Sequence, residues 1–213
     1  MLIFIGINVK IFLYRKFNSW RTDMIIRHYE EKDKENVRFI CLNSEGACKM
    51  TPDERHFILT TYCDYFIEKE GRNCFVAVDG EDKAIAYILC AENFDNYKND
   101  FLAEYPGRLD ENLSVWGGNA REMSTVSARL QEKHKKNFPA HLHIDVIPEY
   151  HRQGIGHQLV DTLCAHLKEK GICGVMLTVG GQNLRGQAFY KKYGFEHIET
   201  DGDDVAFGLR LLG

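Results

Sequence analysis

Two glycines, Gly154 and Gly156, mark the stretch whose residue types favour the binding of an anion. Before them, residues 141 to 147 alternate between polar and apolar, and after them apolar residues recur at helical spacing as far as Gly171. The predicted order is strand, tight turn and helix. Backbone N–H groups without an intrahelical partner converge at such a turn, and glycines let an anion approach them. Phosphate is the group that this arrangement suits.

Polar side chains that could move a proton lie on the strand before the turn. The alternation places His141, His143 and Asp145 on one face, with apolar residues on the other. An imidazole beside a carboxylate can accept a proton, directly or through water. Two other interpretations stay open. The pair could only hold the strand or a neighbouring segment in place, or the three residues could bind a metal ion as the H-x-H-x-D arrangement of metallo-hydrolases does.

The segment from Val146 to Gly156, Val-Ile-Pro-Glu-Tyr-His-Arg-Gln-Gly-Ile-Gly, resembles the acetyl-CoA motif of the GNAT N-acetyltransferase superfamily. That motif is Gln or Arg, then x-x-Gly-x, then Gly or Ala. His151 stands in the place of the Gln or Arg, which weakens a side-chain contact and leaves the main-chain donors intact. A second signature lies further along the chain, with Asn183, then Ala-Phe-Tyr ending at Tyr190, then Gly-Phe. The resemblance spans about residues 24 to 212.

The resemblance implies acetyl-CoA as co-substrate and no metal. By motif position, the turn would bind pyrophosphate through its main chain. The preceding strand, which splays from its neighbour in this family, would pair with pantetheine. The residues implied in cofactor binding are Ile144, Val146, Arg152, Gln153, Gly154, Ile155, Gly156, His157 and Asn183.

The resemblance also implies catalytic roles. Tyr190 matches the family tyrosine that protonates the departing thiolate, which a phenol of pKa ~10 can do for a thiol of pKa ~8.5; the alternative is an aromatic core residue. An alkyl amine of pKa ~10.4 is deprotonated at pH 7 in only about one molecule in 2,500, so a base is needed. Family members often place a glutamate on the central strand. This strand offers Asp145 and His143 instead.

Within the superfamily, residues 139 to 150 are most similar to bacterial acetyltransferases that resemble the acetyltransferase-like domain of O-GlcNAc hydrolases. Some of those domains are thought not to be active enzymes, so the likeness implies no acceptor. An amine on a small molecule or on a protein would fit, and GNAT enzymes are often homodimers. A non-catalytic module that binds coenzyme A is the alternative function, followed by a metallo-hydrolase that uses His141, His143 and Asp145.

The composition limits the class of protein. The 213 residues are 44% hydrophobic and 27% charged, as in a soluble globular protein with one well-buried domain. A net charge of −4 argues against a nucleic-acid-binding surface. The seven cysteines form no C-x-x-C pair, which predicts reduced thiols, no disulfides and a cytoplasmic location.

The first 23 residues differ in character from the rest of the chain. Their apolar run ends at Lys10, well before the roughly 20 residues of a membrane span, and no cleavage site of a signal peptide is evident. We expect residues 1–23 to be an extension outside a single domain, residues 24–213, in which residues 92–139 form a helical insertion.

Periodicity and turn signals predict an α/β (α+β) fold. The order matches the GNAT fold, which implies a mixed, mostly antiparallel central sheet, splayed at the acetyl-CoA site and flanked by helices. The best-defined helix start is Thr51-Pro52-Asp53-Glu54, a capping box with proline at the first helical position. The predicted strands are 24–29, 74–78, 84–90, 141–147, 175–179, 195–199 and 204–212, and the predicted helices are 33–42 with Asp33 as its N-cap, 51–70, 120–136, 155–170 and 183–193.

Overall fold

The computed structural model of this chain describes residues 24–43, 50–126 and 128–212. The predicted N-terminal extension, residues 1–23, lies outside this part, so the domain boundary at Met24 stays a prediction. Among the described residues, no helix combines the length and the apolar content needed to cross a bilayer.

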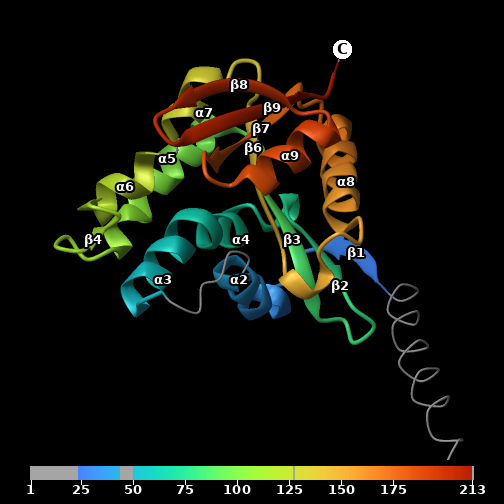
Figure 1. Cartoon of the computed structure of the whole chain (residues 1–213), viewed down its shortest axis with the longest axis horizontal. Helices are drawn as coiled ribbons and strands as arrows, with labels where there is room; N and C mark the ends of the chain where they lie inside the picture. Colours follow the sequence, from blue (N-terminus) through green and yellow to red (C-terminus); the bar gives the residue numbers. More distant parts are fainter. Residues whose placement is uncertain (1–23, 44–49, 127, 213) are drawn as a thin grey trace, which may run out of the picture.

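A seven-stranded sheet forms the centre of the domain, in the order β1-β2-β3-β6-β7-β9-β8 (Figure 1). Neighbouring strands are antiparallel, except that β6 and β7 are parallel. This confirms the predicted mixed, mostly antiparallel sheet. The strands are β1 (Ile25–His28), β2 (Phe75–Val78), β3 (Ala84–Ala91), β6 (Ala140–Val146), β7 (Gly174–Gly180), β8 (Glu196–Asp201) and β9 (Asp204–Arg210).

Helices cover both faces of the sheet. The helix after the glycine turn, α8 (Ile155–Glu169), packs on one face with the predicted apolar stripe buried. Helices α2 (Lys34–Asn43) and α4 (Tyr65–Lys69) contact β3 on the other face, where α7 (Ala128–His134) contacts β7. The alternation along β6 decides which side chains reach which layer. Leu142 lies in the core under α8, whereas His141 and its odd-numbered neighbours face α2 and α4.

The predicted N-cap at Asp33 is wrong. A 3₁₀ turn, η1 (Glu31–Asp33), precedes α2, and Glu30 is the N-cap of this turn. The Asp33 side chain accepts the Glu30 N–H at 2.9 Å and both terminal nitrogens of Arg27 at 2.7 and 2.9 Å. These hydrogen bonds allow the Asp33 carboxylate to be buried. Asp33 therefore acts as the third helical residue of a capping box and not as the N-cap.

The helix predicted over residues 51–70 begins as expected and then changes its winding. The Thr51 hydroxyl accepts the Glu54 N–H, and the Glu54 carboxylate accepts the Thr51 N–H at 2.7 Å, so the capping box is confirmed. The segment η3 (Thr60–Asp64) is π-helical and joins α3 (Pro52–Leu59) to α4. Such π-bulges are rare and often occur at functional sites.

The described residues of the predicted helical insertion form three α-helices, a 3₁₀ turn and a small hairpin. Its first helix is fixed to α4 by an aromatic cluster in which the rings of Tyr97, Phe101 and Tyr105 contact Tyr65. The helix predicted over residues 120–136 is described as α6 and α7, and residue 127 between them lies outside the described residues. The remaining elements are η4 (Gly71–Asn73), α5 (Phe94–Glu104), η5 (Pro106–Arg108), β4 (Ser114–Val115), β5 (Gly118–Asn119), α6 (Ala120–Val126), η6 (Pro148–Tyr150) and α9 (Leu184–Tyr193).

Candidate active site

The sheet opens between its two parallel strands. β6 and β7 pair only at Ala140 with Val175 and at His141 with Met176, although both strands continue for several residues. The Ile147 N–H donates to the Ile85 carbonyl of β3 at 3.1 Å. Because neighbouring residues of a strand point their backbone groups in opposite directions, Ile144 and Val146 direct theirs toward the opening. The predicted splay is therefore present, at the two residues predicted to face it.

The glycine turn directly follows the open end of β6. Arg152 and Gly154 have left-handed backbones, with φ of 61° and 83°, and α8 begins at Ile155 without a side-chain cap. The first helical hydrogen bond of α8 is donated by the Gln158 N–H to the Gly154 carbonyl, at 3.2 Å. In the part of the chain that the structure describes, no hydrogen bond uses the N–H groups of residues 152–157. This is a set of main-chain donors for an anion.

The two glycines of the turn are required for different reasons. A Cβ atom on Gly154 would meet nothing within 4 Å, but the left-handed backbone there disfavours any L side chain. A Cβ atom on Gly156 would lie 3.1 Å from the Phe189 ring of α9. Gly156 therefore permits close packing of α8 against α9, in addition to any approach by a ligand.

His151 joins the turn to β6 and to α9. Its Nε2 lies 2.7 Å from the Val146 carbonyl oxygen, and its Nδ1 lies 3.1 Å from Nη1 of Arg185. The guanidinium can only donate, so Nδ1 accepts and the Nε2–H donates to Val146. The residue that departs from the sequence motif thus holds one of the open backbone groups of β6 and positions a cation beside the turn.

The second signature forms the start and the inner face of α9. The Asn183 side chain accepts the Gly186 N–H at 2.8 Å and so acts as N-cap, and Gly194 ends the helix with a left-handed backbone. Tyr190 is half-buried, and its ring lies 5.7 Å from that of Phe195 and 5.9 Å from that of Phe207. Tyr190 packs against the core on the α8 side of the sheet. This position is compatible with a general acid and with an aromatic core residue, the two roles considered from the sequence.

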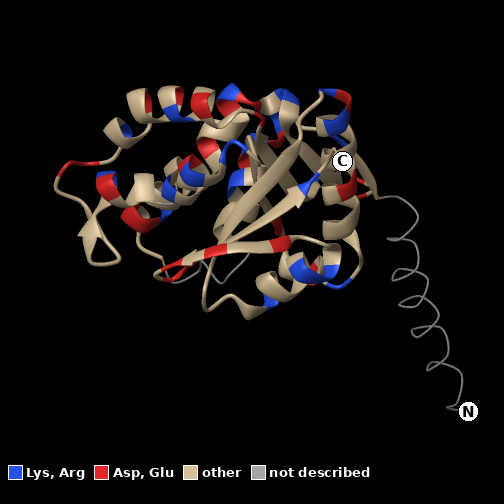
Figure 2. Ribbon diagram, turned by 90° about the horizontal axis from the view of Figure 1, so that it is seen from above, with Lys and Arg blue, Asp and Glu red and all other residues tan. Residues whose placement is uncertain are grey.

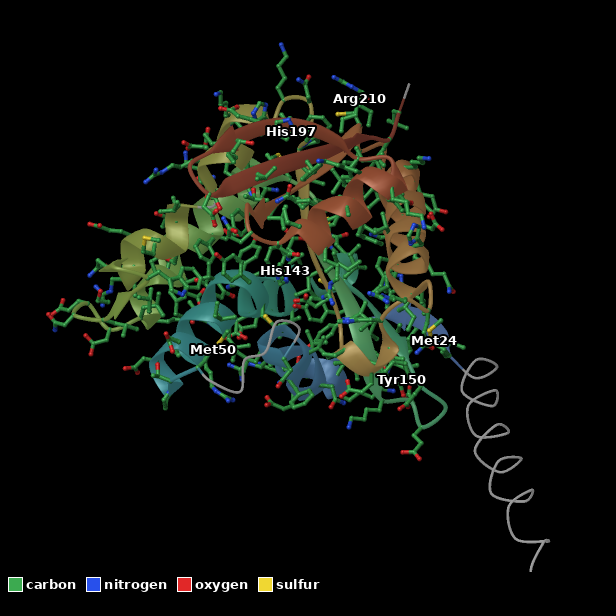
Figure 3. The ribbon with its side chains drawn as sticks, in the orientation of Figure 1. Met24, Met50, His143, Tyr150, His197 and Arg210 are labelled. Carbon is green, nitrogen blue, oxygen red and sulfur yellow. The ribbon has the colours of Figure 1, made fainter. Side chains whose placement is uncertain are left out.

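His143 and Asp145 lie together on the other face of β6, and Tyr87 of β3 links them. The Tyr87 hydroxyl is 2.7 Å from Oδ2 of Asp145 and 3.0 Å from Nδ1 of His143, whereas that Nδ1 and Oδ2 are 3.9 Å apart. The His143 imidazole also stacks on Tyr62 of η3, with ring centroids 5.6 Å apart. Figure 3 shows His143 near the middle of the molecule.

The opposite wall of the opening belongs to β7. Thr178 follows Met176 of β7 by two residues, as His143 follows His141 of β6, and His141 with Met176 is the last pair before the strands part. The Thr178 hydroxyl accepts the amide N–H of Gln131 at 3.3 Å. The opening thus has an imidazole and a carboxylate on one side and hydroxyl and amide groups on the other.

Comparison with known proteins identifies the family. The model of the acetyltransferase (GNAT) family matches residues 39–195. The chain belongs to the GNAT acetyltransferase family. A spermidine N(1)-acetyltransferase of Thermoplasma acidophilum is 32% identical over 110 residues, which are 52% of this chain and 68% of that protein. Together these likenesses identify an N-acetyltransferase.

Solved structures share the fold of this acetyltransferase. The crystal structure of a protein named SsHAT has a TM-score of 0.79 at 24% identity, covering 90% of this chain and 100% of that one. The PaiA N-acetyltransferase of Thermoplasma acidophilum, solved in complex with coenzyme A, has a TM-score of 0.55 at 19% identity, covering 88% of this chain and 98% of that one.

His141 does not join the other two polar residues of β6 in this acetyltransferase. It is buried among aromatic rings, with that of Tyr97 only 4.3 Å away, and burial lowers its pKa to about 3. Within the described ranges, the one group of three metal-ligating side chains is Cys41, His143 and Asp145, whose ligand atoms lie within 4.8 Å of one another. The H-x-H-x-D set of the alternative, metal-binding interpretation is thus divided, because Cys41 of α2, and not His141, lies near His143 and Asp145.

We expect His141 to make stability depend on pH. Its pKa is lowered from an ordinary value of 6.5 to about 3, so the unfolded chain binds a proton over that interval and the folded chain does not. Stability should therefore fall as the pH drops below about 6.5, by about 2 kcal/mol from this residue between pH 7 and pH 5. Urea unfolding of the wild type and of His141→Leu at both pH values measures this difference, and an equal loss in both proteins would contradict it.

His151 offers a second prediction. His151→Ala removes two hydrogen bonds, each of about 1 kcal/mol, and should raise the Kd for acetyl-CoA by about 10-fold. A glutamine can donate to Val146 through its NH₂ group and accept from Arg185 through its oxygen, so His151→Gln should bind within about 3-fold of the wild type. Calorimetric titration with acetyl-CoA compares the three proteins. Equal binding by the alanine variant would show that the bridge does not shape the turn.

Sequence reasoning missed four residues of this site: Cys41, Tyr62, Tyr87 and Arg185. One of them carried a usable signal. Tyr87 brings a hydroxyl into the strand Ala84–Ala91, whose other side chains are aliphatic apart from the thiol of Cys90. A polar group inside a fully buried strand needs a partner.

Proposed function

We propose that this chain transfers the acetyl group of acetyl-CoA to a primary amine by direct attack in a ternary complex. The observation that carries the proposal is the opening between β6 and β7. It has main-chain anion donors at residues 152–157 directly after its open end, and His143 and Asp145 on the face opposite α8. Donor and acceptor could then meet in the opening from its two faces.

The residues present fit acetyl-CoA. Oxygens of a pyrophosphate suit the N–H groups at the start of α8, where the helix dipole also favours negative charge. The open backbone groups of Ile144 and the N–H of Val146, whose carbonyl is bonded to His151, suit the amides of pantetheine. Asn183 and Arg185 lie on the adjoining start of α9. A donor on the open edge of β6 can also face the thioester oxygen as negative charge develops there.

The proposed steps use side chains of this chain as acid and base. The amine nitrogen attacks the carbonyl carbon of the thioester, and the bond between that carbon and sulfur breaks. Before the attack, the ammonium form of the amine gives one proton to the base on β6, which we assign to the pair of His143 and Asp145, and the second proton leaves the nitrogen to solvent after the attack. Tyr190 gives its proton to the thiolate sulfur. Substitutions of His143 or Asp145 therefore test deprotonation of the amine, and substitution of Tyr190 tests protonation of the thiolate.

The charge near the opening favours an acceptor with more than one positive charge. No Lys or Arg occurs from Glu196 to Asp204, and Figure 2 shows acidic segments along this hairpin. Glu199 is paired with Lys133 and His134 of α7, so the acidic groups in question are Asp201, Asp203 and Asp204. Burial raises the pKa of Asp204, as do Asp203 and Asp201. Burial raises the pKa of Tyr62, which stacks on His143, to about 12, and Asp204 adds to this. A diamine or polyamine, as named in the spermidine acetyltransferase relative, suits this setting.

The proposal also includes a subgroup within the family and a cellular location. The similarity of residues 139–150 to bacterial acetyltransferases that resemble the acetyltransferase-like domain of O-GlcNAc hydrolases supports a place near that subgroup. A cytoplasmic location is supported by the thiols of Cys41, Cys63 and Cys74, which are buried and free.

The test is thiol release from acetyl-CoA with a panel of acceptors. We expect turnover with spermidine and agmatine above that with a monoamine such as butylamine, because the second charge can interact with the acidic hairpin. Mass spectrometry of the product identifies the acetylated nitrogen. Acetyl-CoA binding without turnover on any amine would overturn the enzymatic proposal and favour the alternative, a module that only binds coenzyme A.

A further inference from the structure

We infer that Tyr87 is a positioning residue that fixes the tautomer of His143 and so makes Nε2 of His143 the atom that accepts the amine proton. The assignment of His143 as the base rests on the proposed function. The assignment of its tautomer rests on the hydrogen bonds among Tyr87, His143 and Asp145. The inference adds a residue of a neighbouring strand, which no sequence motif contains, to the acid–base chemistry of the site.

The register of the two strands brings the three side chains together. Tyr87 of β3 is the partner of Asp145 on β6, and Leu89 is the partner of His143. Tyr87 is fully buried, and its hydroxyl lies 2.7 Å from Oδ2 of Asp145 and 3.0 Å from Nδ1 of His143. Both distances are those of good hydrogen bonds, so the hydroxyl is shared between the two groups.

The hydrogens can be assigned by counting donors. A phenol has one hydrogen to donate, and an ionised carboxylate only accepts. The Tyr87 hydrogen therefore goes to Asp145, and the hydroxyl oxygen accepts the second bond. The donor of that bond is Nδ1–H of His143. A neutral imidazole has only one N–H, so the lone pair is on Nε2, the nitrogen on the far side of the ring.

The surroundings keep the phenol protonated. Burial first, and then the charge of Asp145, raises the pKa of Tyr87 well above 10. Other titratable groups face the cluster from different elements. The Sγ atom of Cys41 on α2 lies within 4.8 Å of the ligand atoms of His143 and Asp145 and is also a hydrogen-bonding neighbour of Tyr87, and Tyr62 of η3 stacks on the imidazole. The imidazole plane lies at 21° to the ring of Tyr62 and at 28° to that of Tyr87, so both rings restrict its rotation.

The inference specifies how protons move during the reaction. The ammonium form of the acceptor first loses one proton to Nε2 of His143, so the ring becomes an imidazolium and the neutral nitrogen attacks the carbonyl carbon. The second proton leaves the nitrogen to solvent as the carbon–sulfur bond breaks. The Nδ1–H of the imidazolium stays bonded to Tyr87, and the Tyr87 hydrogen stays directed at Asp145, so no proton moves along the chain. The carboxylate stabilises the imidazolium through the phenol, whereas the aspartate of a Ser-His-Asp triad does so by a direct hydrogen bond.

The experiment combines activity with a spectroscopic signature. Tyr87→Phe keeps the ring and removes the hydroxyl, so we expect kcat to fall by about 10-fold or more, with the KM for acetyl-CoA unchanged. In a His143→Ala background the same change should have little further effect, because the two residues act as one unit. If Tyr87→Phe lowers kcat by the same factor in both backgrounds, its role is only structural and the inference is overturned.

The tautomer can be measured without turnover. Nitrogen-15 NMR of histidine-labelled protein should show His143, assigned by its absence in His143→Ala, with Nδ1 protonated and Nε2 not. Asp145→Asn supplies a second variant if Tyr87→Phe does not fold, because an amide can donate to the phenol oxygen and reverse the chain, which predicts the Nε2–H tautomer. An Nε2–H tautomer in the wild type would refute the inference. Absence of acetyl transfer by the wild type, with the expected tautomer present, would refute the proposed function alone.

Discussion

Replacement of Tyr190 by phenylalanine is expected to lower turnover by roughly 10²–10⁴-fold, the usual contribution of a general acid. The change keeps the ring contacts with Phe195 and Phe207 and removes only the hydroxyl. Acetyl-CoA affinity and melting temperature should therefore stay near those of the wild type. Pre-steady-state measurement of thiol release gives the rate of the chemical step and shows whether slow product release limits turnover.

Tyr193 supplies a matched control on the same helix. It lies three residues after Tyr190, its ring also contacts Phe195, and its hydroxyl donates to Asp161 at 2.6 Å. Tyr193→Phe removes an equivalent group away from the proposed chemistry, so it should change stability slightly and turnover little. If Tyr190→Phe and Tyr193→Phe behave alike, Tyr190 is an aromatic core residue, and solvent or another group protonates the thiolate.

The backbone parts of the site could be predicted because local sequence determines them. A strand of alternating polarity, a turn that needs a left-handed residue at Gly154 and an amphipathic helix each depend on neighbouring residues. The face shared by His143 and Asp145 is likewise set by the period of a strand. The direction of open backbone groups at Ile144 and Val146 was available only through the family resemblance, because it depends on where β7 leaves β6.

Contacts between distant segments could not be predicted in the same way. His141 and His143 share a face and a residue type, yet one is enclosed by rings of α4 and α5 and the other is 31% exposed beside the opening. The difference in burial between the two histidines is set by the packing of residues 92–139, which the polar and apolar alternation along β6 does not predict. Tyr87 reaches Asp145 only through the register of β3 with β6, and a shift of one residue would turn it to the other face.

At His151, where the sequence departs from the motif, a contact with a distant residue determines the role of the side chain. The sequence indicated only that a side-chain contact was weakened. The fold instead places Arg185, which is 34 residues away in the chain, against Nδ1 of His151. The imidazole can therefore bridge two segments, as a glutamine could, and the main-chain donors of the turn are retained.

The second large effect is expected from His143→Ala. Removal of the imidazole should lower kcat at pH 7 by roughly 10²-fold or more, because an amine of pKa ~10.4 then has to lose its proton to water. Added imidazole should restore part of the activity by occupying the space that the side chain leaves. His197→Ala is the control, since its ring bonds to Thr200 in the surface hairpin and lies near Phe207, outside the opening.

The size of the loss should depend on the acceptor and on pH, which a structural defect would not reproduce. At pH 9 about one molecule in 25 of such an amine is already deprotonated, compared with about one in 2,500 at pH 7. The variant should therefore gain up to about 100-fold in rate over this interval relative to its own value at pH 7, and it should lose less with an amine whose pKa is near 8. A loss that is constant across pH and across amines would mean that His143 supports the fold of β6 and that Asp145, tested as Asp145→Asn in the same assay, is the group that takes the proton.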